Sequence, residues 1–205
     1  MVLLALTNLV LLGSSRLAVL IRMAALQGLL LGTLPFLTGG ELIVHQWLLA
    51  IAALVLKGAV FPWLLSRARK NAEVRREIEP FVSYMVSLAG GLAALIFSLW
   101  LASRLPCPAN LGSTLVVPLA LFTFLTGLFL IISRKNALTQ VLGYLAMENG
   151  IYAFGLAIAV EAPVLVELGV LLDVFVAVFL MGIVIFHISR EFEHIDTGRL
   201  SSLKG

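Results

Sequence analysis

A single carboxylate lies in the middle of an apolar stretch, 138–158, which reads LTQVLGYLAMENGIYAFGLAI. The carboxylate belongs to Glu148, and Tyr144 and Tyr152 lie four residues to either side, on the same face of a predicted helix. Ionising an acid among apolar groups is unfavourable unless a cation or water reaches it. Glu148 is therefore a candidate member of a proton or ion path, and a structural ion pair or interhelix hydrogen bond is the alternative. The two tyrosines either line the same path or only pack the helix.

Two more ionisable residues lie near the middle of apolar runs. Asp173 is ten residues into the run 163–189, and Lys57 is nine residues from the end of the run 42–66. Glu148 is eleven residues into its own run, or about 16 Å at about 1.5 Å per residue. The three groups are thus expected at one depth, where Lys57 can pair with either acid. Acids in such positions commonly belong to proton or ion paths, and a purely structural ion pair is the alternative.

Further polar residues are candidates for the same path. Glu167 lies six residues before Asp173, about 9 Å nearer the outer surface by helix rise, and is either a path member or a headgroup contact. Lys57 is either a path member or a structural partner. The other possible path-lining residues, for which packing or an interfacial position is the alternative, are Tyr144, Asn149, Tyr152, Arg22, His45 and His187.

Composition identifies the environment of these charges. Hydrophobic residues make up 61% of the 205 residues and charged residues only 12%, about half the share in an ordinary soluble domain. Most of the chain must therefore lie in lipid. The basic residues stand in short clusters between apolar runs, and the net charge of +3 is small, so a nucleic-acid surface is not expected.

The apolar runs predict an all-α membrane protein with about seven transmembrane helices, since a crossing takes about 20 apolar residues. The first run follows no basic segment, so we interpret it as a helix and not as a cleaved signal. The predicted spans are 1–14, 17–38, 42–66, 81–103, 113–132, 137–160 and 163–189.

Basic residues orient these helices, because Lys and Arg in short loops stay on the cytoplasmic side. All but two of the 14 basic residues fall near the ends that follow the first, third, fifth and seventh spans. The exceptions are Lys57, inside a span, and Arg104, in a loop of the opposite side. The N-terminus is therefore expected outside and the C-terminus in the cytoplasm.

A faint internal repeat suggests how the chain is organised. Gln27-Gly28 matches Asn149-Gly150 at an offset of 122 residues. Either one three-helix unit was duplicated, or Leu-rich helices agree by chance. On the first interpretation the chain divides into a three-helix unit (1–69), a charged cytoplasmic loop with a linking helix (70–112), a second three-helix unit (113–190) and a cytoplasmic tail (191–205).

The sequence lacks the ligand sets of a redox or metal centre. Its one cysteine, Cys107, cannot form a disulfide framework, a paired-cysteine zinc site or an iron–sulfur site within one chain. The three histidines, His45, His187 and His194, have no metal-ligand spacing, and neither a P-loop nor a dinucleotide fingerprint is present. We expect no cofactor and no active site of the chain's own.

The segments around these charges resemble one family. The run SRKNALTQVLGYLAMENGIYAFGLAI, the segment VELGVLLDVF and the tail EFEHID…RLSSLK are similar to the hydrogenase-4 component E family, as is LVLKGAVFPWLL around Lys57. The resemblance covers the whole chain. Its last three predicted helices are also similar to the K subunit of respiratory complex I and to the C subunit of multi-subunit sodium/proton antiporters. The K subunit carries one acid at the membrane centre, where Glu148 falls, and a second in its last helix, where Asp173 falls as a shorter carboxylate.

The resemblance implies a function within a larger assembly. It implies a membrane-arm subunit of a group 4 nickel–iron hydrogenase or formate-hydrogenlyase-type complex in a bacterial or archaeal cytoplasmic membrane, with the central acids in a proton-translocation path. The implied partners are antiporter-like membrane subunits and a hydrogenase-proximal membrane subunit, with soluble hydrogenase and iron–sulfur subunits reached indirectly. A subunit of a cation/proton antiporter complex and a purely structural bridging subunit are the alternatives.

Overall fold

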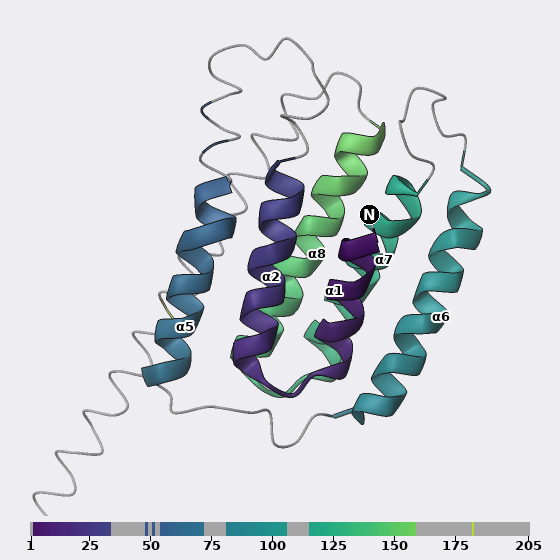
Figure 1. The fold of residues 1–205 in the computed structure, drawn as a ribbon. Helices are drawn as coiled ribbons and strands as arrows, with labels where there is room; N and C mark the ends of the chain where they lie inside the picture. The colour runs from purple at the N-terminus through teal and green to yellow at the C-terminus, as the bar shows by residue number, and fades with distance from the viewer. Residues whose placement is uncertain are drawn as a thin grey trace, which may run out of the picture.

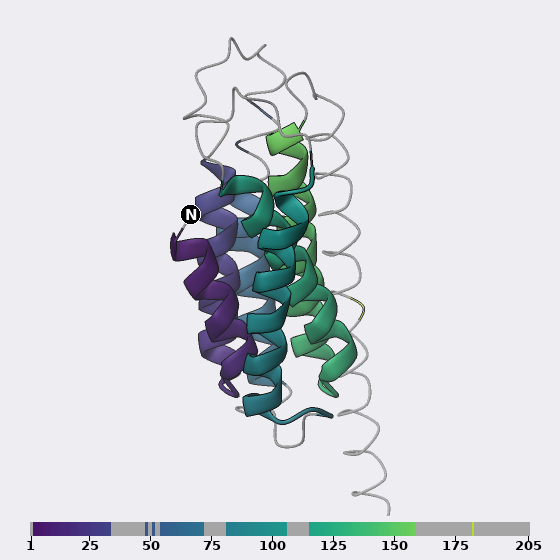
Figure 2. The ribbon, with the colours of Figure 1, turned by 90° about the vertical axis from the view of Figure 1, so that its right-hand side faces the viewer.

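The computed structural model describes residues 2–33, 48, 51, 54–71, 81–105, 115–158 and 182, and the regular elements in this part of the chain are all helical. The helices lie side by side as a bundle with roughly parallel axes (Figures 1 and 2). The elements are α1 (Val2–Gly13), α2 (Leu17–Gly32), η1 (Leu56–Val60), α5 (Phe61–Asn71), α6 (Tyr84–Ala102), α7 (Val116–Ser133) and α8 (Ala137–Ile158).

Two tight helical hairpins, α1–α2 and α7–α8, bring distant parts of the chain together (Figure 1). Each turn contains an arginine with extended backbone, Arg16 at φ −87° and ψ 106° and Arg134 at φ −108° and ψ 139°, which ends one helix before the next begins. The Asn136 side chain accepts a hydrogen bond from the Leu138 N–H at 2.9 Å and so caps the start of α8. A hydrogen bond from Arg134 to the carbonyl of Leu12, at 2.8 Å, places both turns at the same end of the bundle.

Glycines allow α7 and α8 to pack with their backbones in contact. A Cβ atom on Gly143 would lie 2.8 Å from the Leu130 Cβ and 2.9 Å from the Gly127 carbonyl oxygen. A Cβ atom on Gly127 would overlap the Met147 backbone, and one on Gly150 would overlap that of Phe124. Close approach through small residues is typical of membrane helix pairs, where dispersion contacts hold helices together. The α7–α8 hairpin is therefore the tightly packed part of the fold, and it carries Glu148.

The core lies between the two hairpins and α5. One cluster of buried apolar side chains joins α1, α2, α5, α7 and α8, and a second joins α1, α2, α7 and α8. Phe61 and Leu65 bring α5 into the first cluster, each with about 1% of its surface exposed. This packing fixes the segment that leads into α5, and that segment contains Lys57.

Helix α6 shows the opposite pattern and turns most of its apolar side chains away from the chain. Ser87, Gly91 and Ser98 face inward, whereas Met85, Leu92 and Ile96 are exposed. In the described part, α6 and α7 are long and apolar enough to cross a bilayer. The expected number of seven spans and their orientation stay predictions, because the predicted span 163–189 lies almost wholly outside the described residues, as does part of the span 42–66.

Two predicted boundaries differ from the structure. The third run was expected to end at residue 66, but α5 continues to Asn71. Arginine, alanine and lysine are good helix formers, so a basic sequence such as Arg67–Lys70 prolongs a helix beyond the apolar run. Basic residues in a last turn also interact favourably with the helix dipole. The residues 67–71 are thus helical, and the expected linker from residue 70 begins inside a helix.

Candidate functional site

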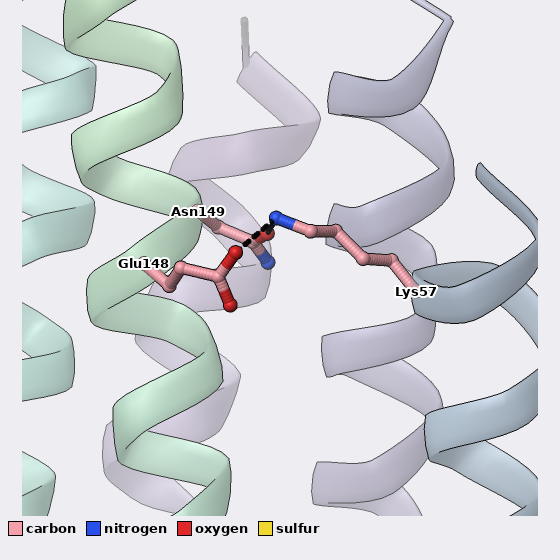
Figure 3. A network of polar contacts seen from close by, with 3 residues as sticks. All are labelled: Lys57, Glu148 and Asn149. Carbon is pink, nitrogen blue, oxygen red and sulfur yellow. Dashed lines mark hydrogen bonds and ion pairs between the residues drawn. The ribbon is translucent and has the colours of Figure 1, made fainter. Parts of the chain in front are cut away.

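A buried ion pair joins the two halves of the chain. Lys57 Nζ lies 2.7 Å from Glu148 Oε1, and the side chains are 8% and 2% exposed. Lys57 belongs to η1 and Glu148 to α8, 91 residues later, and Figure 3 shows the two side chains meeting between their helices. The expected pairing of Lys57 with a central acid is therefore confirmed for Glu148.

Helix α8 surrounds the ammonium group with more than one electron-rich group. Asn149 Oδ1 accepts a longer hydrogen bond from Lys57 Nζ at 3.4 Å (Figure 3). The Nζ atom also lies 5.2 Å from the centroid of the Tyr152 ring, within the range of a cation–π interaction. Residues 148, 149 and 152 share one side of the helix, so a single element supplies a carboxylate, an amide oxygen and an aromatic face. The ammonium would keep two of these partners if the carboxylate were neutralised.

Among the described residues, only one of the two oxygens of Glu148 has a donor. Lys57 donates to Oε1, whereas the buried Oε2 accepts no hydrogen bond from this part of the chain. A buried carboxylate oxygen without a donor is unfavourable, and the next available donor, a water molecule or an arriving proton, would relieve that cost. The site thus combines a paired charge with one open acceptor position.

A π-helical turn presents Lys57 to this site. The Phe61 N–H donates to the Leu56 carbonyl, five residues back, because Pro62 has no N–H and its ring disfavours a regular α-helical turn before it. On the other side, α2 approaches without a gap: a Cβ atom on Gly28 would lie 2.7 Å from the Lys57 Cβ. The local backbone and the neighbouring glycine together set the position of the lysine.

A small cavity lies beside Lys57 and Asn149. Its volume is about 10 Å³, about the space that the centre of one water molecule needs. The lining comes from α2, α5 and α8 and is otherwise apolar, with Ile21, Ala25 and Leu145 among its residues. One water molecule fits next to the polar atoms of Lys57 and Asn149.

A second polar group of residues, which we call the amide cluster, consists of Thr7, Asn8, Gln27 and Thr123. All four side chains are buried, and their hydrogen bonds connect α1, α2 and α7. Only the Gln27-Gly28 landmark of the repeat pointed weakly to this cluster, because uncharged polar residues are common in membrane helices. Polar residues at one depth on three apolar helices would have been the signal to follow.

Arg134 is another residue whose position the charge pattern did not predict. It was counted only as an orientation signal, yet its side chain is fully buried. It donates to the Leu12 carbonyl at the end of α1, and its guanidinium lies 4.6 Å from the centroid of the Tyr84 ring at the start of α6. A cation at the carboxyl end of a helix is favourable, so Arg134 ties the ends of α1, α6 and α7 together.

The other candidates divide into three groups. Tyr144 packs, half-buried, against the core. Arg22 is exposed and is not brought to the ion pair. Four candidates lie outside the described residues, namely Asp173, Glu167, His45 and His187.

Comparison with known proteins defines the class to which this arrangement belongs. Residues 115–205 match the family described as NADH-ubiquinone/plastoquinone oxidoreductase chain 4L. Hydrogenase-4 component E of Escherichia coli (strain K12) is 31% identical over 156 residues, which cover 75% of this chain and 71% of that protein. The chain belongs to the hydrogenase-4 component E family.

A second relative matches over a longer stretch of this chain, and its name assigns it no activity. The uncharacterized protein Rv0085 of Mycobacterium tuberculosis is 33% identical over 194 residues, which cover 90% of this chain and 85% of that protein. No solved structure matches the chain.

Proposed function

We propose that this chain is a membrane-arm subunit of a redox-driven, ion-pumping complex related to complex I, of the group 4 nickel–iron hydrogenase or formate-hydrogenlyase type. Two relationships support the assignment: the relative named hydrogenase-4 component E, and the match of residues 115–205 to an oxidoreductase chain. The redox reaction occurs in other subunits. This chain contributes a proton-holding group at the centre of the membrane.

The observation that carries the proposal is the buried Lys57–Glu148 pair with its open Oε2 atom. A proton that reaches the site adds to Oε2 and turns the carboxylate into a neutral acid. The charge attraction to Lys57 is then lost, while Asn149 and Tyr152 still face the ammonium group. Loss of the proton restores the pair, so protonation and the position of Lys57 are coupled.

The path continues beyond this pair in the same proposal. Asp173 supplies a second central acid, and Glu167 lies nearer the outer surface. The chain spans a bacterial or archaeal cytoplasmic membrane about seven times, with the N-terminus outside and the C-terminus in the cytoplasm. Antiporter-like membrane subunits and a hydrogenase-proximal membrane subunit lie beside it, and neither a cofactor nor a catalytic centre resides in the chain.

A structural tie is the second candidate function, and the same ion pair favours it. Buried pairs often hold two elements in register, and removing one partner then leaves an uncompensated charge that costs about 3–5 kcal/mol. In that case the pair would join the halves of the chain without moving a proton.

The substitution Glu148→Gln separates the two functions. It keeps the size of the side chain and an oxygen for Lys57, but it removes the titratable group. We expect the assembled complex to form in normal yield and to lose most of its proton translocation, measured with a pH-sensitive dye in membrane vesicles. Redox turnover falls if coupling is tight and persists if protons slip.

Two other results would contradict the proton-relay function. Normal proton translocation by a fully assembled Glu148→Gln complex would refute the relay. Failure to assemble, with recovery when Lys57→Met is added, would establish the structural tie instead.

A further inference from the structure

The amide cluster forms a chain of hydrogen bonds across three helices, in which Gln27 Oε1 alone accepts none from the described residues. Gln27 Nε2 donates to Thr7 Oγ1 at 3.0 Å and to Asn8 Oδ1 at 2.7 Å. Asn8 Nδ2 donates in turn to Thr123 Oγ1 at 2.8 Å. All four side chains are at most 2% exposed, so no bulk water competes for these bonds.

The directions of the hydrogen bonds indicate that the cluster holds helices in position and does not transfer protons. The hydroxyl of Thr7 donates to the Leu4 carbonyl at 2.8 Å, and that of Thr123 donates to the Leu119 carbonyl at 2.7 Å. Both hydroxyl protons are therefore committed to the backbone of their own helices. The remaining links are amide N–H groups, which do not pass on a proton readily. The cluster instead fixes α2 relative to α1 and α7.

Helix α2 links this cluster to the ion pair through adjacent residues. Gln27 is in the cluster, and Gly28 lies against Lys57, where an added Cβ would come within 3.2 Å of the Lys57 carbonyl carbon and oxygen. The two backbones are thus in close contact, and α2 cannot come nearer at this point without displacing the lysine backbone. The side chain of Gln27 and the backbone of Lys57 are thus connected by one rigid turn of helix.

We propose that the amide cluster positions Lys57 for its ion pair with Glu148. It does so by holding α2 in place, so that Gly28 stays in contact with the Lys57 backbone. The inference rests on the proposed function for its importance to proton transfer, but the positioning itself concerns only geometry. Thr7, Asn8, Gln27 and Thr123 are positioning residues, since none of them is within hydrogen-bonding distance of Lys57 or Glu148. A small displacement of a reacting group can lower a rate up to about 100-fold, so loosening the cluster should weaken proton transfer without breaking the bundle.

Two threonines on α7 give a matched test. Thr123 and Thr126 are both buried, but the hydroxyl of Thr126 makes no hydrogen bond in the described part of the chain. The substitutions Thr123→Val and Thr126→Val are the same chemical change, three residues apart on one helix. Only the first removes a bond of the cluster, and Thr123→Ser restores the hydroxyl.

The readout is the infrared band of the Glu148 carboxylate in the purified complex, identified as the band that Glu148→Gln abolishes. We expect its frequency to shift in Thr123→Val, to stay unchanged in Thr126→Val and to return in Thr123→Ser. Proton translocation in vesicles should fall about 10-fold or more in Thr123→Val alone, within the range that such displacements produce. If Thr123→Val does not assemble, Gln27→Asn replaces it, because this change keeps the amide and shortens its reach.

An unchanged carboxylate band in an assembled Thr123→Val or Gln27→Asn complex would overturn the positioning role. If the carboxylate band shifts in Thr123→Val while the Glu148→Gln complex translocates protons normally, the positioning role stands and the proposed function is refuted. The two failures are therefore distinguishable.

Discussion

At the scale of single residues, the unequal surroundings of Lys57 and Glu148 determine how each responds to loss of the other. The ammonium has Asn149 Oδ1 and the Tyr152 ring nearby in addition to the carboxylate. Within the described part of the chain, the carboxylate has the lysine on one oxygen and no donor on the other. Removing the lysine should therefore cost more than neutralising the acid.

This asymmetry predicts the order of stability in a double-mutant cycle. We expect Lys57→Met to lower the stability of the assembled complex by about 3–5 kcal/mol, because it leaves a buried carboxylate without a cation. Glu148→Gln should cost less, and the double variant should recover most of the loss. Thermal unfolding of the four proteins measures these values. A double variant no more stable than Lys57→Met would contradict the pairing.

The residues that sequence reasoning identified are the charged ones, and the reason is physical. A charge in an apolar run is so unfavourable that its depth alone predicts a partner, and Lys57 and Glu148 do meet. The uncharged side chains of Asn8, Gln27 and Thr123 are less costly to bury, so they are a weaker signal in the sequence, and only a shared depth on three apolar helices points to their convergence. Arg134 was placed in a loop by its neighbours, although its side chain is buried against Tyr84.

At the scale of helices, the backbone contact between α7 and α8 holds the acid-bearing element in place. A Cβ atom on Gly127 would lie 2.6 Å from the Met147 Cα. Because that atom belongs to the backbone, no change of side-chain rotamer could relieve the overlap. Met147 immediately precedes Glu148, so any change at this contact moves the acid as well. The apolar runs predicted the two helices, but the glycine contacts between them follow from tertiary packing.

Two glycine-to-alanine changes test this contact. We expect Gly127→Ala to destabilise the protein by at least about 1–3 kcal/mol, the usual effect of overpacking. The control, Gly90→Ala on α6, places its Cβ 3.6 Å from the Phe129 ring, an ordinary contact, and should be neutral or stabilising by up to about 1 kcal/mol through helix propensity. Thermal unfolding followed by circular dichroism gives both values. Equal stability of the two variants would show that α7 and α8 do not touch in this way.

At the scale of the whole molecule, the exposed apolar face of α6 and the common end of the two hairpin turns bear on how the chain lies in a membrane. Most of α6 is exposed, and its large side chains are apolar, which suits lipid or a neighbouring membrane subunit. The turns 14–16 and 134–136 share one end, as the predicted topology requires of two cytoplasmic loops.

Cysteine labelling in intact cells tests the proposed orientation. The native Cys107 falls in a loop predicted to lie outside, so a membrane-impermeant maleimide should label it. In a Cys107→Ser background, Ser15→Cys in the turn between α1 and α2 should react only after the membrane is permeabilised. Neither change alters a charge, so the basic residues that set the topology stay in place. Labelling of Ser15→Cys in intact cells would reverse the orientation.

The π-helical turn at η1 has a consequence for insertions and deletions in this chain. Inserting a single residue into an α-helix produces a π-helical turn, which has one residue more than an α-helical turn. In this chain the π-helical turn is followed closely by Pro62. Deleting the exposed Ala59 should restore an α-helical turn and leave Lys57 and the core residues of α5 on their original faces, provided that Pro62→Ala removes the ring clash. The same deletion elsewhere, such as Ala93 in α6, would rotate everything beyond it by about 100° and should prevent assembly. The segment around Lys57 is therefore a place where this helix can change its length by one residue without losing its register.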